Sequence, residues 1–384
     1  MRIIVAPDSF KGSLSALQAA KAIREGILRA APEAQIELVP MADGGEGFTE
    51  ALAAAMNGEM IEADAHDPLG RPLRASYAFD EATGTAVIEC AAASGLTLLA
   101  DGERDPLRAS TYGTGELIKA ALDRGSSRIL LGLGGSATND GGIGMAQALG
   151  FRFLNEAGEA IPAFGEGWHD IAAIDTSGAD PRLADVRFIA ACDVDAPLYG
   201  ESGASAVFGP QKGASPETVE RLDAVLRRLA LCITRDLRVD VHALAGGGAA
   251  GGLGAGLYAF CGAAMQKGVD LVLDACKFDE RLTGAAFVIT GEGRTDEQTA
   301  MGKTAAGIAQ LARKRGVPVI CLSGGLTGSY SSLHEFGIDA CFSIMPHPAS
   351  LADAIAKAEI WLADAAEQIV RLFAAARRSR DEQG

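Results

Sequence analysis

The stretch RIIVAPDSFKGSLSALQAAKAIREGI, residues 2–27, indicates the fold class. Residues 2–6 form a short β-rich run, and a polar loop follows over residues 7–13. Ser15, with Gln18 three residues later, is the pattern of a capping box at a helix N-terminus. Apolar residues at helical spacing follow this pair, so the stretch predicts a strand, a loop and an amphipathic helix.

The same alternation of strands and helices occurs at both ends of the chain. The N-terminal part continues with a strand at 36–39, a loop at 41–47 and a helix that stops at Asn57-Gly58. Strands alternating with helices predict a parallel α/β sheet. In the C-terminal third we expect strands at 287–290, 317–322 and 340–344, a helix at 303–314, and a long final helix capped by Ser350 and Asp353.

The middle of the chain follows a different pattern. It contains the hairpin-like run RPLRASYAFDEATGTAVIEC, residues 71–90, and a long helix predicted from Ser215 and Pro216. We therefore expect two α/β domains. The first is a discontinuous Rossmann-like or flavodoxin-like domain of residues 1–65 and 285–384, and the second is an inserted domain of residues 66–284. Two consecutive domains split near residue 200 are the alternative.

The composition excludes several classes of protein. The net charge of -16 argues against binding to nucleic acid or to an anionic membrane surface. The seven cysteines contain no CxxC pair, and the five histidines lack metal-binding spacing. The first apolar run is interrupted at Asp8, too early for a signal peptide, so a cytoplasmic location is expected. The oligomeric state stays open, with a homo-oligomer among the alternatives.

Loops that follow strands are the expected ligand-binding segments of an open α/β sheet. The first such loop, PDSFKGS at residues 7–13, contains Asp8 and Lys11 ahead of a helix N-terminus. Asp8 is a candidate acid/base or metal ligand, and Lys11 a candidate anion contact. An ordinary loop in which Asp8 and Ser13 cap the helix is the alternative.

The loop ADGGEG, residues 42–47, brings two carboxylates to the same sheet edge. Asp43 and Glu46 suit recognition of a hydroxyl group or Mg²⁺. A tight turn with solvated acids is the alternative.

The loop GLGGSATNDGGIG, residues 132–144, follows an apolar strand. Gly132, Gly134 and Ala137 fit the loose GxGxxG/A dinucleotide pattern, but residues 139–142 delay the helix that should follow at once. Backbone N–H groups of such a loop can form an anion-binding nest. A phosphate cradle is therefore favoured over a dinucleotide turn.

Two further loops contain carboxylates or cations. GEGRTDEQTAMGKT, residues 291–304, ends like a P-loop, but Glu297 stands where a P-loop needs glycine. Its Arg294, Asp296 and Lys303 suit a magnesium nucleotide or a phosphorylated product. In ACDVDAPLYG, residues 191–200, Asp193 directly follows a strand, as a general base, a Mg²⁺ ligand or an Asx-turn residue would.

Six motifs together resemble one protein family. MRIIVAPDSFKGSLSA, MADGGEGF, GLGGSATNDGGIGMAQALG, ACDVDAPLYG, FGPQKGAS and ITGEGRTDEQTAMGK occur in this order along nearly the whole chain. They are similar to bacterial glycerate kinase of the glycerate 2-kinase type. The resemblance implies transfer of the γ-phosphoryl group of ATP to D-glycerate, with Mg²⁺, to give 2-phosphoglycerate. It also implies two α/β domains with the active site in the interdomain cleft.

On this basis, roles can be given to individual residues as hypotheses. Asp193 is the first candidate for the base and Asp8 the second, with Lys11 also catalytic. The candidate substrate contacts are Ser9, Asp43, Glu46, Arg71 and Arg294. The candidate phosphate contacts are Gly134, Gly135, Ser136, Thr138, Asn139, Asp140, Gly141, Gly142 and Lys303. The candidate metal ligands are Asp296 and Asp193. The alternative functions are an NAD(P)-dependent hydroxy-acid oxidoreductase and a non-catalytic sugar-acid-binding protein.

Overall fold

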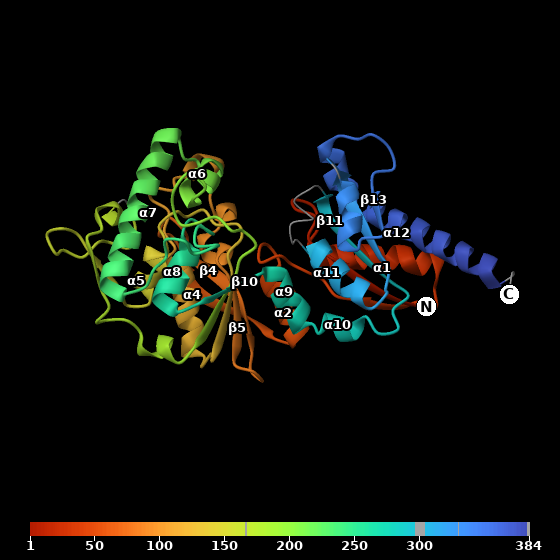
Figure 1. Cartoon of the computed structure of the whole chain (residues 1–384), viewed down its shortest axis with the longest axis horizontal. Helices are drawn as coiled ribbons and strands as arrows, with labels where there is room; N and C mark the ends of the chain where they lie inside the picture. The colour runs from red at the N-terminus through yellow and green to blue at the C-terminus, as the bar shows by residue number, and fades with distance from the viewer. Residues whose placement is uncertain (166, 296–303, 329, 382–384) are drawn as a thin grey trace. The chain divides into compact units, whose positions relative to one another are not determined.

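A computed structural model describes residues 1–165, 167–295, 304–328 and 330–381. The chain divides into two compact units, one of residues 1–43 with 269–384 and one of residues 44–268. Figure 1 labels some of the elements of each, and the expected α/β class with parallel strands is confirmed. Among the described residues, no helix is long and apolar enough to cross a membrane.

The first unit is built on a five-stranded, fully parallel sheet in the order β13-β12-β11-β1-β2. This is the flavodoxin-like order, in which the chain reverses direction across the sheet between β1 and β11. Its elements are β1 (Arg2–Pro7), α1 (Ala16–Ala30), β2 (Gln35–Leu38), α9 (Gly268–Ala275), α10 (Phe278–Arg281), β11 (Phe287–Thr295), α11 (Thr304–Lys314), β12 (Val319–Leu326), the 3₁₀ segment η7 (Tyr330–Phe336), β13 (Ala340–Ser343) and α12 (Leu351–Asp381).

Local sequence signals set the helices of this unit. The predicted capping box is confirmed, because Ser15 Oγ accepts the Gln18 N–H and the Gln18 side chain accepts the Ser15 N–H. Helix α1 buries Ile23 and Ile27 against the sheet and α12, in a core shared with Trp361.

The second unit contains a six-stranded sheet in the order β10-β9-β6-β5-β4-β3. Strands β10, β9, β6 and β5 are parallel, and β4 and β3 complete the sheet as an antiparallel hairpin. The strands of this unit are β3 (Glu59–His66), β4 (Pro72–Asp80), β5 (Thr85–Glu89), β6 (Arg128–Gly132), β7 (Arg152–Leu154), β8 (Ala173–Asp175), β9 (Arg187–Ala191) and β10 (Ala264–Gln266). The α-helices are α2 (Phe48–Met56), α3 (Ala91–Ser94), α4 (Tyr112–Asp123), α5 (Ile143–Ala148), α6 (Ala204–Phe208), α7 (Pro216–Leu237) and α8 (Leu253–Cys261). Short 3₁₀ segments are η1 (Leu96–Leu98), η2 (Asp101–Glu103), η3 (Gly167–Asp170), η4 (Pro181–Ala184) and η5 (Pro210–Lys212).

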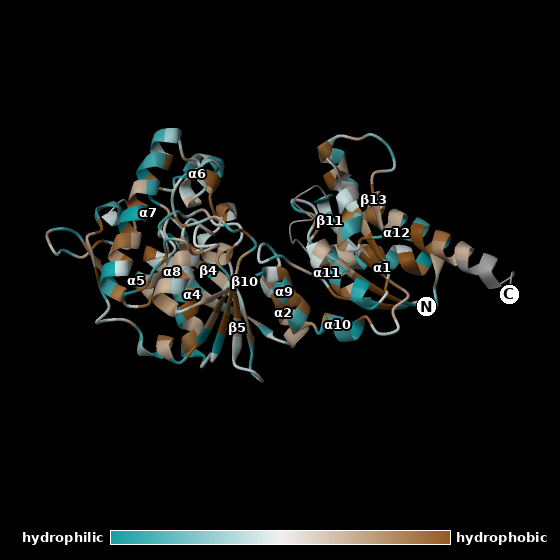
Figure 2. Ribbon diagram, in the orientation of Figure 1, coloured by the Kyte–Doolittle hydropathy of each residue, from teal (hydrophilic) through white to brown (hydrophobic). Residues whose placement is uncertain are grey.

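Helix α7 begins as predicted, with Ser215 Oγ accepting the Thr218 N–H and Pro216 at the first helical position. Hydrophilic and hydrophobic residues both occur along α7 (Figure 2), and its apolar face buries Leu226 and Leu229. This helix therefore covers part of the core of the second unit.

The observed unit boundaries lie near residues 43 and 268, away from the expected 65 and 285. Strand β3 pairs with β4 along its whole length, which places α2 and β3 in the second unit. At the other boundary, α9 lies against α11 at Gly307, so α9 belongs to the first unit.

Candidate active site

Asp8 is the most unusual carboxyl group of the first unit. It follows β1 at the point where the sheet order reverses, and its side chain is 8% exposed. Its Oδ1 accepts the Ser9 N–H at 2.6 Å and its Oδ2 accepts the Thr304 hydroxyl at 2.6 Å. Burial, and then the nearby charge of Asp43, raise the pKa of Asp8 to about 7. A carboxyl group with this pKa can accept a proton near neutral pH.

A polar group without a partner lies directly beside Asp8. The hydroxyl oxygen of Ser9 is buried and makes no hydrogen bond to the described residues. Because buried hydroxyls are normally paired, this one is suited to receive a ligand.

Two cations line a cavity of about 520 Å³ in the same unit. Lys11 is exposed and lowers the pKa of Asp8 by its charge, and Arg294 donates through Nε to Thr327 Oγ1 at 3.1 Å. The apolar part of the cavity lining includes Phe10, Ile344 and Trp361. The structure thus brings Asp8, Ser9 and Lys11 together with Asp43, and places Lys11 and Arg294 on one cavity.

In the second unit, the glycines of residues 132–135 pack against another loop. The Gly134 N–H donates to Gly44 O at 3.1 Å, and a Cβ on Gly134 would lie 2.4 Å from Gly45 Cα. The two backbones can approach this closely only without side chains. The predicted close backbone approach at Gly134 is therefore to the 42–47 loop.

Asp140 is held by hydrogen bonds within the fold. Its carboxylate is fully buried and accepts hydrogen bonds from the Thr111 N–H and hydroxyl and from the N–H groups of Gly142 and Gly144. Four donors occupy its oxygens, so we withdraw Asp140 as a phosphate contact. Gly141 is equally enclosed, since a Cβ there would lie 2.2 Å from Leu229 Cδ2.

Gly142 is buried against α8, and Thr138 and Asn139 are fully buried beneath the loop. Asn139 donates from Nδ2 to Ser205 Oγ at 3.0 Å, whereas its Oδ1 and the Thr138 hydroxyl have no partner among the described residues. Of the predicted phosphate contacts with described positions, only Gly134 and Gly135 are not fully buried, with Ser136 just beneath them.

Lys212 is a residue of this site that the sequence did not assign. It ends η5, is 2% exposed, and donates from Nζ to Ser136 Oγ at 2.8 Å and to Thr138 O at 2.7 Å. Burial lowers the pKa of Lys212 to about 8. The only sequence signal was its position in FGPQKGAS, between glycines.

Glu89 ends strand β5 and Asp193 follows strand β9, and β6 lies between these two strands in the second sheet. Glu89 pairs in register with Gly132, and Gly132 pairs with Ala191. Asp193 is exposed, and its Oδ1 accepts the Gly268 N–H at 3.2 Å. Burial raises the pKa of Glu89, whose Oε1 accepts the Thr49 N–H at 2.8 Å. Glu89 had gone unnoticed because it ends a strand inside an ordinary hairpin pattern.

Arg71 does not lie among these groups. Its guanidinium forms ion pairs with Asp67 at 2.5 Å and with Glu103 at 2.8 Å. Both carboxylates hold the guanidinium, which also donates to Leu98 O at 3.3 Å, and they tie the β3–β4 turn to residue 103. We therefore withdraw Arg71 as a substrate contact and assign it a structural role.

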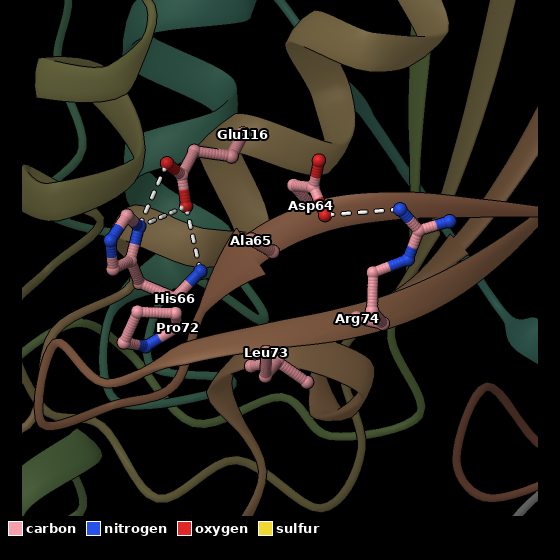
Figure 3. Close-up of a pocket in the computed structure, with 7 residues that line it drawn as sticks. All are labelled: Asp64, Ala65, His66, Pro72, Leu73, Arg74 and Glu116. Atoms are coloured by element: carbon pink, nitrogen blue, oxygen red, sulfur yellow. Dashed lines mark hydrogen bonds and ion pairs between the residues drawn. The ribbon is translucent and has the colours of Figure 1, made fainter.

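A second cavity, of about 410 Å³, lies in the same unit beside β3 and β4 (Figure 3). His66 hydrogen-bonds Glu116 at 2.9 Å, and Asp64 pairs with Arg74 at 3.1 Å. Since its ionisable side chains pair with one another, this cavity is a weaker candidate for a ligand site.

Asp296 and Lys303 lie outside the described residues, so their predicted roles stay predictions. Glu46 is exposed in the second unit and acts on the pKa of Glu89. Within the described ranges, no group of three or more His, Cys, Asp or Glu side chains could hold a metal ion.

The whole chain is similar to proteins of known family. Residues 3–374 match the sequence profile of the glycerate kinase family. A glycerate kinase from Halalkalibacterium halodurans is 50% identical over 367 residues, which cover 96% of this chain and 97% of that protein. A glycerate 2-kinase from Escherichia coli strain K12 is 46% identical over 354 residues, covering 92% and 93%.

A solved structure also matches. A crystal structure described as glycerate kinase 2 from Salmonella typhimurium LT2 superimposes with a TM-score of 0.86 at 47% identity, covering 98% of this chain and 99% of that one. The resemblance deduced from the six motifs is thereby confirmed, and the chain belongs to the glycerate kinase family.

Proposed function

We propose that this protein phosphorylates D-glycerate with ATP, placing the γ-phosphoryl group on the C2 hydroxyl to give 2-phosphoglycerate. The observation that carries this proposal is the similarity over almost the full length to proteins named glycerate kinase and glycerate 2-kinase. Such a reaction requires mainly positioning of the reactants and neutralisation of charge.

Asp8 is our candidate for the base that accepts the proton of the attacking hydroxyl. Its pKa of about 7 keeps a useful fraction ionised at neutral pH while leaving it basic enough to take a proton. The unpartnered Ser9 hydroxyl beside it offers a hydrogen bond to the same substrate. This ranking places Asp8 before Asp193, which is exposed and accepts the Gly268 N–H.

The proposed contacts to the substrate carboxylate, the phosphates and Mg²⁺ follow from the charges of the residues. Lys11 and Arg294, on one cavity, suit the carboxylate of glycerate. The exposed part of the 134–136 loop suits the phosphates of the nucleotide. Mg²⁺ favours one or two carboxylates together with phosphate oxygens, and Asp193 and Asp296 stay the candidates to hold it. When bound, Mg²⁺ would neutralise negative charge on the phosphates.

The alternative functions have no support. An NAD(P)-dependent enzyme would need the glycine turn to open directly into a helix, but residues 133–142 separate β6 from α5. A non-catalytic binding protein would not need a buried base.

³¹P NMR of a reaction containing D-glycerate, ATP and Mg²⁺ tests kinase activity and phosphorylation position together. We expect one new phosphomonoester, coupled to the single C2 proton. Coupling to two C3 protons would refute the position, and no ADP formation would refute the kinase.

A further inference from the structure

Lys212 is a buried cation, and none of its hydrogen-bond partners among the described residues is a carboxylate. Within the described ranges, its Nζ donates to the Ser136 hydroxyl and the Thr138 carbonyl, both neutral acceptors. The carboxylate of Asp140, whose charge raises the pKa of Lys212, already accepts from four donors of its own. Burying an ammonium with neutral acceptors alone is unfavourable, so an additional anion would stabilise it.

The loop that Lys212 contacts at Ser136 has two backbone N–H groups without a partner in the described part of the chain. The backbone N–H groups of Gly135 and Ser136 make no hydrogen bond to the described residues, although the Gly135 carbonyl accepts the Leu96 N–H. Gly135 has φ +74 and is exposed. Successive N–H groups around a left-handed residue are a known arrangement for binding anions.

The Ser136 hydroxyl connects the buried ammonium of Lys212 to the backbone N–H groups of Gly135 and Ser136. Its oxygen accepts the hydrogen bond of Lys212, which directs its own proton elsewhere, and Oγ makes no other hydrogen bond within the described part of the chain. A hydroxyl that accepts from a charged donor becomes a stronger donor itself. It can pass the influence of the ammonium to a ligand that Lys212, at 2% exposure, does not touch.

The geometry points to Lys212 as the positioning cation of a polyphosphate-binding site whose surface is Gly134–Ser136. The ligand class is the triphosphate chain of a nucleotide, bound by two backbone N–H groups and the Ser136 hydroxyl over a buried positive charge. This inference rests on the proposed kinase function, because only that function supplies a polyphosphate. If Lys212 had a purely structural role and merely linked two loops, its replacement would not selectively weaken polyphosphate binding.

Inorganic tripolyphosphate is the probe, because it has the phosphates of ATP and no base. Its binding is measured by isothermal titration calorimetry at pH 7.5 and fixed ionic strength, with and without Mg²⁺. The proteins compared are wild type, Lys212→Met, Ser136→Ala, the double variant of these two, and Lys119→Met. Lys119 is an exposed lysine of α4 and serves as the matched control. Steady-state KM values for ATP and D-glycerate, and melting temperatures, are measured for each protein.

We expect Lys212→Met to weaken tripolyphosphate binding and raise KM for ATP by ~10-fold or more, the loss typical of a charge-assisted contact. KM for D-glycerate should change less than ~2-fold. Ser136→Ala should give a smaller loss of the same kind, and the double variant should be less than additive because both act through one hydroxyl. Lys119→Met should resemble wild type.

Three results would overturn the inference. Wild type could fail to bind tripolyphosphate, Lys212→Met could bind it normally, or Lys212→Met could lose both substrates equally. If Lys212→Met does not fold, Ser136→Ala decides, since it keeps the ammonium: normal binding by that variant overturns the inference. Kinase failure is recognised separately, as tripolyphosphate binding by a wild type that does not phosphorylate D-glycerate.

Discussion

Replacing Asp8 with asparagine should stabilise the fold above neutral pH while it abolishes most activity. In the unfolded chain an aspartate loses its proton near pH 3.8, whereas burial raises the pKa of Asp8 to about 7 in the folded protein. Between these values the folded state holds a proton that the unfolded state lacks, so stability falls as pH rises through this window. A shift of ~3 pKa units corresponds to ~4 kcal/mol above pH 7.

Asparagine does not ionise, so the stability of the variant does not fall in this way as the pH rises. It makes weaker hydrogen bonds to its neighbours, however. Its single carbonyl oxygen can replace only one of the two carboxylate oxygens that now accept from the Ser9 N–H and the Thr304 hydroxyl. A donor left unsatisfied costs ~1–3 kcal/mol. The variant should therefore be more stable than wild type by ~1–3 kcal/mol at pH 8, and less stable by up to ~2 kcal/mol at pH 4.5, where wild type has lost only ~1 kcal/mol.

Calorimetric melting from pH 4.5 to 8.5 measures this crossing, and kcat at pH 8 should fall by ~10² or more if Asp8 is the base. Asp180→Asn is the control, because the hydrogen bond from Arg182 lowers the pKa of Asp180. That carboxylate stabilises the fold above its unfolded pKa, so its loss should lower the melting temperature at pH 8 and leave kcat unchanged. Parallel melting curves for Asp8→Asn and wild type would refute the buried-charge argument, and near-normal kcat would refute the base.

Four other substitutions test the site and its scaffold. Asp193→Asn should raise the Mg²⁺ concentration needed for half-maximal activity; a ~10²-fold fall in kcat that added Mg²⁺ does not restore would return the base to Asp193. Arg71→Met should lower the melting temperature and leave KM for D-glycerate within ~2-fold; a larger rise in KM would restore Arg71 as a substrate contact. Gly251→Ala should cost ~3 kcal/mol or more in urea unfolding, because a Cβ there would lie 1.9 Å from Thr138 O, whereas Gly262→Ala, with no atom within 4 Å, should cost ~1 kcal/mol.

Local sequence signals predicted the helices and strands well. The features that they did not predict depend on pairing between distant segments. Ser15 with Gln18, and Ser215 with Pro216, fix helix starts through contacts within a few residues. The boundary between the compact units lies near residue 43 and not near 65, because the pairing of β3 with β4 decides where β3 belongs.

The candidate site shows the same limit. The glycine clusters correctly predicted close backbone approach, but the sequence does not say whether the approaching partner is a ligand or, as for Gly134, another glycine loop. Lys212 and Thr304 were missed because their partners lie 76 and 296 residues away. Side chains joined across such separations are brought together only by the complete sheet.

Asp8 and Asp140 show why a buried aspartate with a raised pKa does not by itself mark a catalytic group. Burial raises the pKa of both. Asp140 is surrounded by four donors that hold two helix N-termini in place, so a change in its protonation would disrupt the loop and do no chemistry. Among the described residues, Asp8 has one donor on each oxygen, a second carboxylate acting on it in Asp43, and beside it a Ser9 hydroxyl without a partner. Its remaining acceptor capacity is what a substrate hydroxyl requires, and this unfilled capacity distinguishes the catalytic candidate from the structural aspartate.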